Sequence, residues 1–141
     1  EPPSNIFRYC VQGPIWPQDC PVVVHIDEID RQIIFSTLAC PDMTDYHKTG
    51  QELAFFDMDS LTFPLIIRNV QPGDRFSPYG LHGSQKIKKY FIDHKVPRQW
   101  RWTCPVLTSG QKIIWLVGHR IAEDCKVTSS TRMILRAELA C

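Results

Sequence analysis

The residues best suited to chemistry in this chain are the cations that follow position 83. Four of them could neutralise an anion such as a phosphate: Lys86, Lys88, Lys89 and Lys95. Gly83 and Ser84 precede them at the predicted start of a helix, where free backbone N–H groups and the helix dipole favour a phosphate. The pattern therefore predicts an anion-binding surface, with a phosphate site at Gly83 and Ser84.

Groups for catalysis are few. His82, His94 and Asp74 could serve a small independent enzyme, but no nucleophile–base pair accompanies them. The sequence has no G-x-S-x-G, no Walker-type phosphate loop and no H-E-x-x-H. His94 continues the apolar face of the predicted helix, which favours a hydrogen-bonded, partly buried histidine over a general base. Asp57 and Asp59 follow a predicted strand, where carboxylates commonly cap turns.

The six cysteines do not form a recognisable metal or disulfide pattern. No C-x-x-C pair occurs, and the five histidines supply no H-x3-5-H pair. Scattered cysteines in a chain that can bury its own core are typical of reduced, partly buried thiols. We therefore expect no metal site and a cytoplasmic protein.

The predicted basic helix is defined by its apolar residues. These recur at the i, i+3, i+4 and i+7 positions of one helical face: Ile87, Tyr90, Phe91 and His94. Ser84 is the predicted N-cap, which gives a helix of about three turns. Val96 and Pro97 should end it, because a residue before proline avoids the α region. A second short turn starting at Pro97 should carry Arg98 and Arg101.

A strand and a tight turn are predicted ahead of this helix. Residues 64–70 are apolar and β-branched, as in a strand. Pro72 and Gly73 then occupy the two central positions of a type II turn over 71–74. Proline and glycine in residues 77–83 exclude a helix there.

The other elements are predicted to be strands. They span residues 21–26, 31–39, 53–56, 105–108, 112–117 and 131–139, with a polar connection at 40–50. An acidic loop at 27–30 should close one hairpin, and Ser109-Gly110-Gln111 another. Trp115 is expected in the core. Six or seven strands with one main basic amphipathic helix predict an α+β fold, mostly antiparallel, arranged as a β-sandwich or open barrel.

Charge is unevenly distributed along the 141 residues. Residues 1–60 hold three basic and ten acidic side chains, whereas residues 61–141 hold thirteen basic and five acidic ones. We expect one compact domain with an acidic, β-rich segment at 1–60 and a basic recognition module at 61–141. A region of net positive charge attracts polyanions. The charges could also be solvated surface, or the two segments could face each other in the fold. No apolar run approaches the roughly 20 residues of a membrane span.

Several motifs in the chain resemble one known family. They occur in the order FPL-x-x-R, PGDRF, P-x-G, G-S-x-K-I-K-K-x-F, KVPR, P-V-L-x-S-G and I-I-W-L-V-G. This order resembles the C-terminal region of bacterial tRNA(Ile)-lysidine synthetase, over residues 55–139. The family's SGGxDS loop is absent, so we expect a fragment without the catalytic domain. Asn69 and Gln71 are neutral, whereas family members often carry basic residues after position 68.

The resemblance implies an enzyme that joins lysine to C2 of the wobble cytidine of a tRNA(Ile) with anticodon CAU, through an adenylated intermediate. ATP and Mg²⁺ are implied for the missing catalytic domain. For this chain alone, the resemblance implies no cofactor and no catalysis. The implied C-terminal domain is a β-sandwich with helices, similar to a domain of the phenylalanyl-tRNA synthetase β-subunit. Its implied role is to hold the tRNA, chiefly the acceptor stem.

Lysine and arginine contacts to phosphates can provide that grip without reading sequence. The predicted tRNA contacts are Arg68, Arg75, Lys86, Lys88, Lys89, Arg98 and Arg101. Arg68 could instead pair with Asp74 and brace the turn. Trp100 or Trp102 could stack on an exposed base, although an aromatic beside a helix end more often covers the core.

The expected partners are tRNA and the N-terminal catalytic domain of the same protein, with a homodimer possible. Two other functions stay open. One is a protein-interaction or self-assembly domain, in which the acidic segment of one copy meets the basic segment of another. The other is the small independent enzyme considered above.

Overall fold

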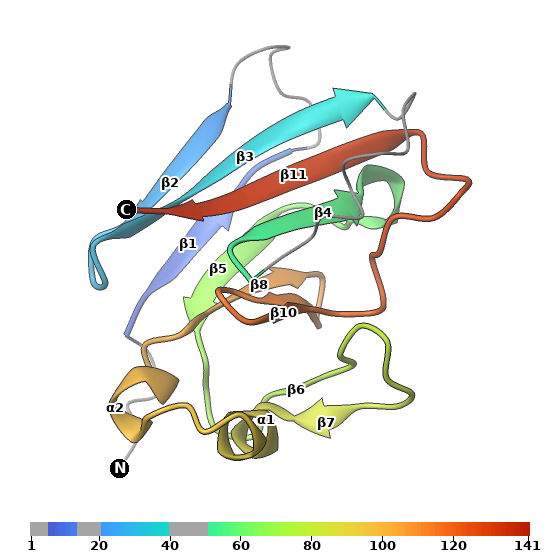
Figure 1. The fold of residues 1–141 in the computed structure, drawn as a ribbon. Helices are drawn as coiled ribbons and strands as arrows, with labels where there is room; N and C mark the ends of the chain where they lie inside the picture. The colour runs from blue at the N-terminus through green and yellow to red at the C-terminus, as the bar shows by residue number, and fades with distance from the viewer. Residues whose placement is uncertain (1–5, 14–20, 40–50) are drawn as a thin grey trace.

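The computed structural model describes residues 6–13, 21–39 and 51–141 (Figure 1). Five antiparallel strands form the first sheet, in the order β1–β5–β8–β9–β10. These strands are β1 (Arg8–Val11), β5 (Leu65–Asn69), β8 (Pro105–Ser109), β9 (Lys112–Leu116) and β10 (Arg120–Ile121). The hairpin predicted around Ser109-Gly110-Gln111 is confirmed as β8 and β9.

A four-stranded antiparallel sheet faces the first one, in the order β2–β3–β11–β4. Its strands are β2 (Val22–Ile26), β3 (Arg31–Ala39), β11 (Met133–Ala140) and β4 (Leu53–Asp57). Ile26 pairs with Arg31, which confirms the hairpin closed by residues 27–30. Both sheets combine strands from the acidic and the basic segments of the sequence. The connection predicted at 40–50 lies outside the described residues.

The middle strands of the first sheet, β8 and β9, are buried on both faces. One hydrophobic cluster lies between the two sheets and contains Phe35, Phe56 and Trp115. A second cluster lies on the other face of the first sheet and contains Phe91 and Leu116. Successive residues of a strand point to opposite faces, so Trp115 of β9 belongs to the first cluster and Leu116 to the second. The predicted core position of Trp115 is confirmed, since the residue is fully buried.

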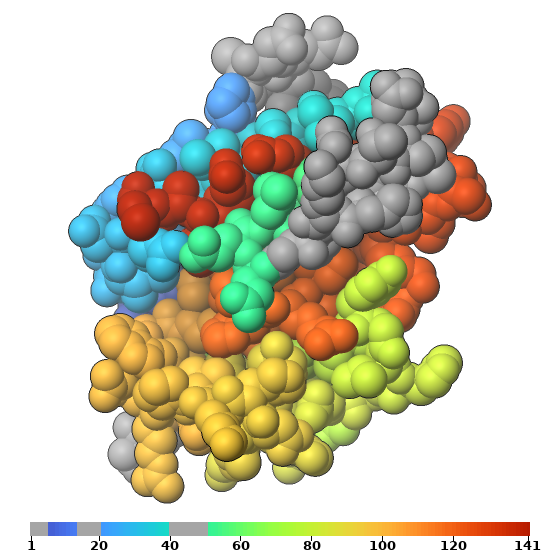
Figure 2. Space-filling model, in the orientation of Figure 1, coloured from blue at the N-terminus to red at the C-terminus, as the bar shows by residue number. Residues whose placement is uncertain are grey.

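The second cluster is covered by a basic segment from the middle of the chain, residues 75–101, which lies at one end of the molecule (Figure 2). The segment contains a two-stranded sheet of β6 (Arg75–Phe76) and β7 (Gln85–Lys86), and the helices α1 (Ile87–Asp93) and α2 (Arg98–Arg101). Figure 2 shows α1 and α2 gathered, in yellow and light orange, at one end of the molecule. The predicted α+β, mostly antiparallel fold is confirmed.

The predicted start of the basic helix is wrong. Arg75 pairs with Lys86 and Phe76 with Gln85, so the chain stays extended where the sequence predicted the first helical turn. Ser84 is therefore not an N-cap, and α1 has seven residues, or about two turns. The helix also ends earlier than predicted, at Asp93 instead of Val96. The second short turn predicted to start at Pro97 is confirmed as α2. Within the described residues, no helix is long and apolar enough to cross a membrane.

Candidate nucleic-acid interface

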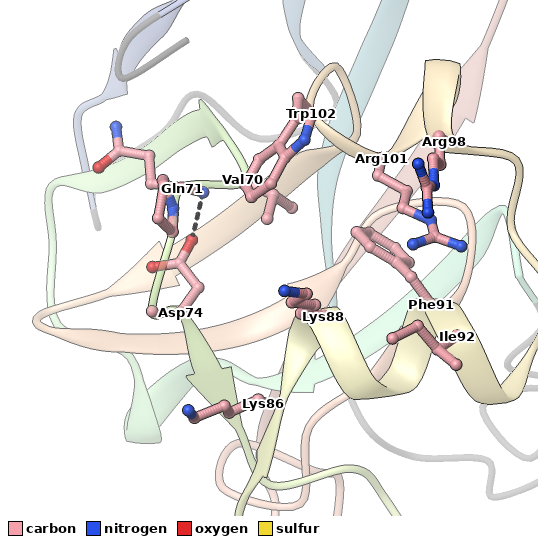
Figure 3. A pocket seen from close by; sticks show the side chains of 12 residues that line it. Val70, Gln71, Asp74, Lys86, Lys88, Phe91, Ile92, Arg98, Arg101 and Trp102 are labelled. Carbon is pink, nitrogen blue, oxygen red and sulfur yellow. Dashed lines mark hydrogen bonds between the residues drawn. The ribbon is translucent and has the colours of Figure 1, made fainter. Parts of the chain in front are cut away.

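A cleft of about 990 Å³ lies between the turn at residues 71–74 and the two helices (Figure 3). Its basic lining residues come from the start of α1 and from α2: Lys86, Lys88, Arg98 and Arg101. Among the described residues of the lining, Asp74 is the one carboxylate, and it comes from the turn opposite the helices. Val70, Phe91 and Trp102 supply apolar surface. The cleft thus combines a strong positive charge with apolar walls.

Asp74 does not cancel this positive charge, because Arg68 already pairs with it. The Arg68 guanidinium donates from Nη1 to Oδ2 at 2.8 Å and from Nη2 to Oδ1 at 3.1 Å. The Asp74 Oδ2 also accepts the Gln71 backbone N–H at 2.8 Å. The predicted bracing of the turn by Arg68 is therefore confirmed, and its side chain is only 19% exposed.

The turn and the helix are also joined through the backbone. The N–H of Ile87, the first residue of α1, donates to the Asp74 carbonyl at 3.0 Å. The Arg101 Nε donates to the Val96 carbonyl at 2.8 Å, which ties α2 to the segment that connects it to α1. These bonds fix the elements from which the basic side chains project.

The outer cations of the cleft keep their charges available. Lys86, Lys88 and Arg98 are exposed. Within residues 6–13, 21–39 and 51–141, no carboxylate forms an ion pair with any of the three. Unpaired cations around a concave surface favour an anionic ligand.

Arg75 and Lys89 do not line the cleft. They line a neighbouring hollow of about 480 Å³, and Lys86 lies on the rim that the two concavities share. Gly83 and Ser84 also line this hollow. The Ser84 Oγ accepts hydrogen bonds from the Arg75 Nε at 3.2 Å and Nη2 at 3.1 Å. The predicted phosphate site at a helix N-terminus is wrong, since no helix begins at Gly83 or Ser84.

The tryptophans of α2 and its C-terminal end differ in burial. Trp102 packs against the second hydrophobic cluster and lines the cleft, as expected for a residue that covers the core. Trp100 is 59% exposed and lies outside the cleft lining.

The model of the TilS substrate C-terminal domain family matches residues 65–137, just over half of the chain. The chain belongs to this family. It is 44% identical over 86 residues to the tRNA(Ile)-lysidine synthase of Dehalococcoides mccartyi (strain CBDB1), covering 61% of this chain and 18% of that protein. It is 39% identical over 94 residues to the enzyme of the same name from Caldanaerobacter subterraneus subsp. tengcongensis, covering 67% of this chain and 20% of that protein. The chain therefore spans about a fifth of the length of these relatives.

Solved structures share the fold of this TilS C-terminal domain. A crystal structure described as the TILS C-terminal domain superposes with a TM-score of 0.76 at 20% identity, covering 96% of this chain and 98% of that one. An N-terminal fragment of the phenylalanyl-tRNA synthetase β-subunit from Pyrococcus horikoshii gives 0.53 at 17% identity, covering 64% and 29%. The family resemblance and the fold that it implied are both confirmed.

Two histidines of this TilS domain, His94 and His119, contact the aromatic residues of α1. His94 is exposed, contrary to the predicted partial burial, but its Nδ1 lies 2.9 Å from the Tyr90 carbonyl oxygen, as expected of a hydrogen-bonded histidine. Its ring stacks on Tyr90 with centroids 3.9 Å apart. His119, which the sequence did not single out, contacts Tyr90 and Phe91 edge-on. Burial, and then nearby His94, lower the pKa of His119.

The described residues contain no group of three His, Cys, Asp or Glu side chains that could hold a metal ion. Cys10, Cys104, Cys125 and Cys141 are free thiols. Burial raises the pKa of Cys104 and raises that of Cys125 to about 11, so both thiols stay protonated at neutral pH.

Asp57 caps a short turn by accepting the Asp59 N–H at 3.1 Å, which confirms its predicted capping role.

Proposed function

We propose that this chain is the non-catalytic, tRNA-binding C-terminal domain of a tRNA(Ile)-lysidine synthase, and that the cleft holds phosphates of the tRNA acceptor stem. The observation that carries the proposal is the convergence of Lys86, Lys88, Arg98 and Arg101 on one cleft whose only carboxylate is already paired. The relatives that share these residues' segment bear the name of a tRNA-modifying enzyme.

Backbone recognition fits the chemistry of this cleft. A-form RNA has a deep, narrow major groove that side chains cannot read, so duplex RNA is held chiefly through its phosphates and 2′-hydroxyls. Lysine and arginine supply such contacts and set the position of the RNA without reading its sequence. Arg101 is partly buried in the cleft, and a charge in a lower dielectric attracts a phosphate more strongly than an exposed one.

We further propose that lysine ligation, with its ATP and Mg²⁺, takes place in the part of the enzyme that this chain does not include. The N-terminal catalytic domain would then be a partner of this domain in a cytoplasmic enzyme. This division of labour predicts that the chain alone forms no lysidine. Detectable lysidine formation by the chain alone would contradict it.

Self-association is a second candidate function. A separate hollow of about 670 Å³ is lined by Asp27, Glu28, Asp30 and Glu52. This acidic hollow could receive the basic helices of another copy. Analytical ultracentrifugation over a concentration series tests it, since a dimer of this kind should dissociate with added salt and should compete with RNA.

The tRNA proposal is tested by measuring the affinity of an unmodified tRNA(Ile) transcript. Replacing Lys86, Lys88 and Arg98 by alanine should weaken binding by roughly tenfold or more. The matched control replaces three exposed cations outside the cleft, Arg8, Lys112 and Arg132, and should bind much more tightly than the cleft variant. Equal losses in the two variants would reduce the cleft to one part of a diffuse positive surface.

A further inference from the structure

The hollow beside the cleft also combines cations with apolar side chains, but its largest apolar side chain is exposed to solvent. Arg75, Lys86 and Lys89 supply its fixed positive charge, and none of the described residues in its lining is a carboxylate. Pro78 and Leu81 supply apolar surface. Leu81 is 52% exposed, so the concavity presents a large apolar side chain to solvent beside several cations.

The loop that carries this apolar surface is held firmly. The Arg120 Nε and Nη2 donate to the Tyr79 carbonyl at 3.2 and 2.9 Å. The Tyr79 N–H donates to the Ile121 carbonyl at 3.0 Å, and the Gly80 N–H to Glu123 Oε1 at 3.1 Å. The loop is thus bonded to β10 and the residues after it. It provides a preorganised platform, so a ligand loses little freedom in ordering it.

The cations of the hollow are placed for a ligand. Ser84 orients the Arg75 guanidinium through two hydrogen bonds. Lys89 has one partner, Asp93 at 3.0 Å, in an exposed pair of the kind that contributes little stability. Lys89 can therefore turn toward a phosphate at small cost.

An apolar platform flanked by cations matches one class of nucleic acid. Bases within a duplex are stacked on each other and present no free face, whereas an unpaired base can lie against an apolar or aromatic side chain while its phosphate meets a cation. We infer that this hollow binds an unpaired nucleotide adjoining the RNA duplex held in the cleft. The inference rests on the proposed function. Lys86 lines both concavities, so one continuous RNA backbone would run past Lys86 from the cleft into the hollow.

The test compares a blunt RNA hairpin with the same hairpin bearing four unpaired nucleotides at its 3′ or 5′ end. At least one extension should tighten binding by about fivefold or more. Leu81→Ser and, separately, Lys89→Ala should bring the extended-to-blunt affinity ratio close to one. Leu81→Met keeps the apolar surface and should preserve the ratio, as should Lys112→Ala, which removes an exposed lysine outside both concavities.

The outcomes separate this inference from the proposed function. Tight blunt-hairpin binding with no gain from either extension would overturn the inference and leave the duplex-binding cleft intact. A gain that survives both Leu81→Ser and Lys89→Ala would also overturn it, because the unpaired nucleotide would then lie elsewhere. Failure of every RNA to bind would overturn the proposed function itself. Thermal melting of each variant confirms that the fold is retained.

Discussion

The Arg68 guanidinium and the Asp74 carboxylate meet through two hydrogen bonds, of 2.8 and 3.1 Å. This pair connects the end of β5 to the turn that forms one wall of the cleft. It also neutralises the only carboxylate in the cleft lining. One interaction thereby shapes the wall and preserves the positive potential of the opposite side.

Replacing Asp74 by alanine should therefore destabilise the domain by about 2 kcal/mol. The change removes both bonds to Arg68 and the bond to the Gln71 N–H, and it leaves a largely buried guanidinium without its partner. Urea unfolding measures the loss. Asp93→Ala is the matched control, since it breaks only exposed interactions, a pair with Lys89 and a long hydrogen bond from Gln85, and should cost less than about 0.5 kcal/mol. Equal losses would argue against a bracing role for Asp74.

Asn69 secures the N-terminal strand region to β5. It is fully buried, and its Oδ1 accepts the N–H groups of Ile6 at 2.9 Å and Phe7 at 3.2 Å. Asn69→Ala leaves these two N–H groups without their acceptor and should lower the free energy of unfolding by about 1 to 3 kcal/mol. Hydrogen exchange should show the loss first at Ile6 and Phe7. Unchanged protection there would contradict this role.

The two tryptophans around α2 should differ sharply in their contribution to stability. Trp102→Ala removes an aromatic ring packed on the second cluster and should cost about 2 kcal/mol or more. Trp100→Ala removes a ring that is 59% exposed and should cost less than about 0.5 kcal/mol. Urea unfolding of both variants provides the comparison. The reverse order would mean that Trp102 does not cover the core.

His119 should make the domain less stable in mild acid. Burial lowers its pKa in the folded state below the ordinary value of about 6.5, so the unfolded chain binds the proton more readily. Its contribution to stability is complete above about pH 6.5 and is lost as the pH falls through the folded-state pKa. Urea unfolding at about pH 7.5 and about pH 5.5 should show a smaller acid loss in His119→Gln than in the wild type. Parallel losses would exclude His119 as the source.

Local features of the sequence were enough to predict the hairpins and the start of α2. Pro97 and the loop at residues 27–30 act through their own backbone preferences. Ser84 misled the prediction because cross-strand pairing of β6 with β7 overrides its local preference for an N-cap. The strands β1, β6, β7 and β10 were missed because each is short. In addition, β1 depends on pairing with β5, which is distant in sequence.

The candidate site shows the same limit. Lys86, Lys88, Arg98 and Arg101 were predicted from residue type, and the structure brings these four to one cleft. Arg75 and Lys89 line the neighbouring hollow instead. The sequence did not predict this separation, because its pattern predicted a longer helix than α1. Asn69, which looked like a missing phosphate contact, instead bonds residues more than sixty positions away. No local signal marked His119, whose aromatic contacts, Tyr90 and Phe91, both come from α1.

The most direct test of the account is the salt dependence of tRNA(Ile) binding. If the four cleft cations each neutralise a phosphate, the logarithm of the binding constant should fall against the logarithm of salt concentration with a slope of about −3 to −3.5. Alanine at Lys86, Lys88 and Arg98 should flatten that slope to about −1. A slope near zero in the wild type, or the same slope in both proteins, would contradict the claim that this cleft holds the tRNA.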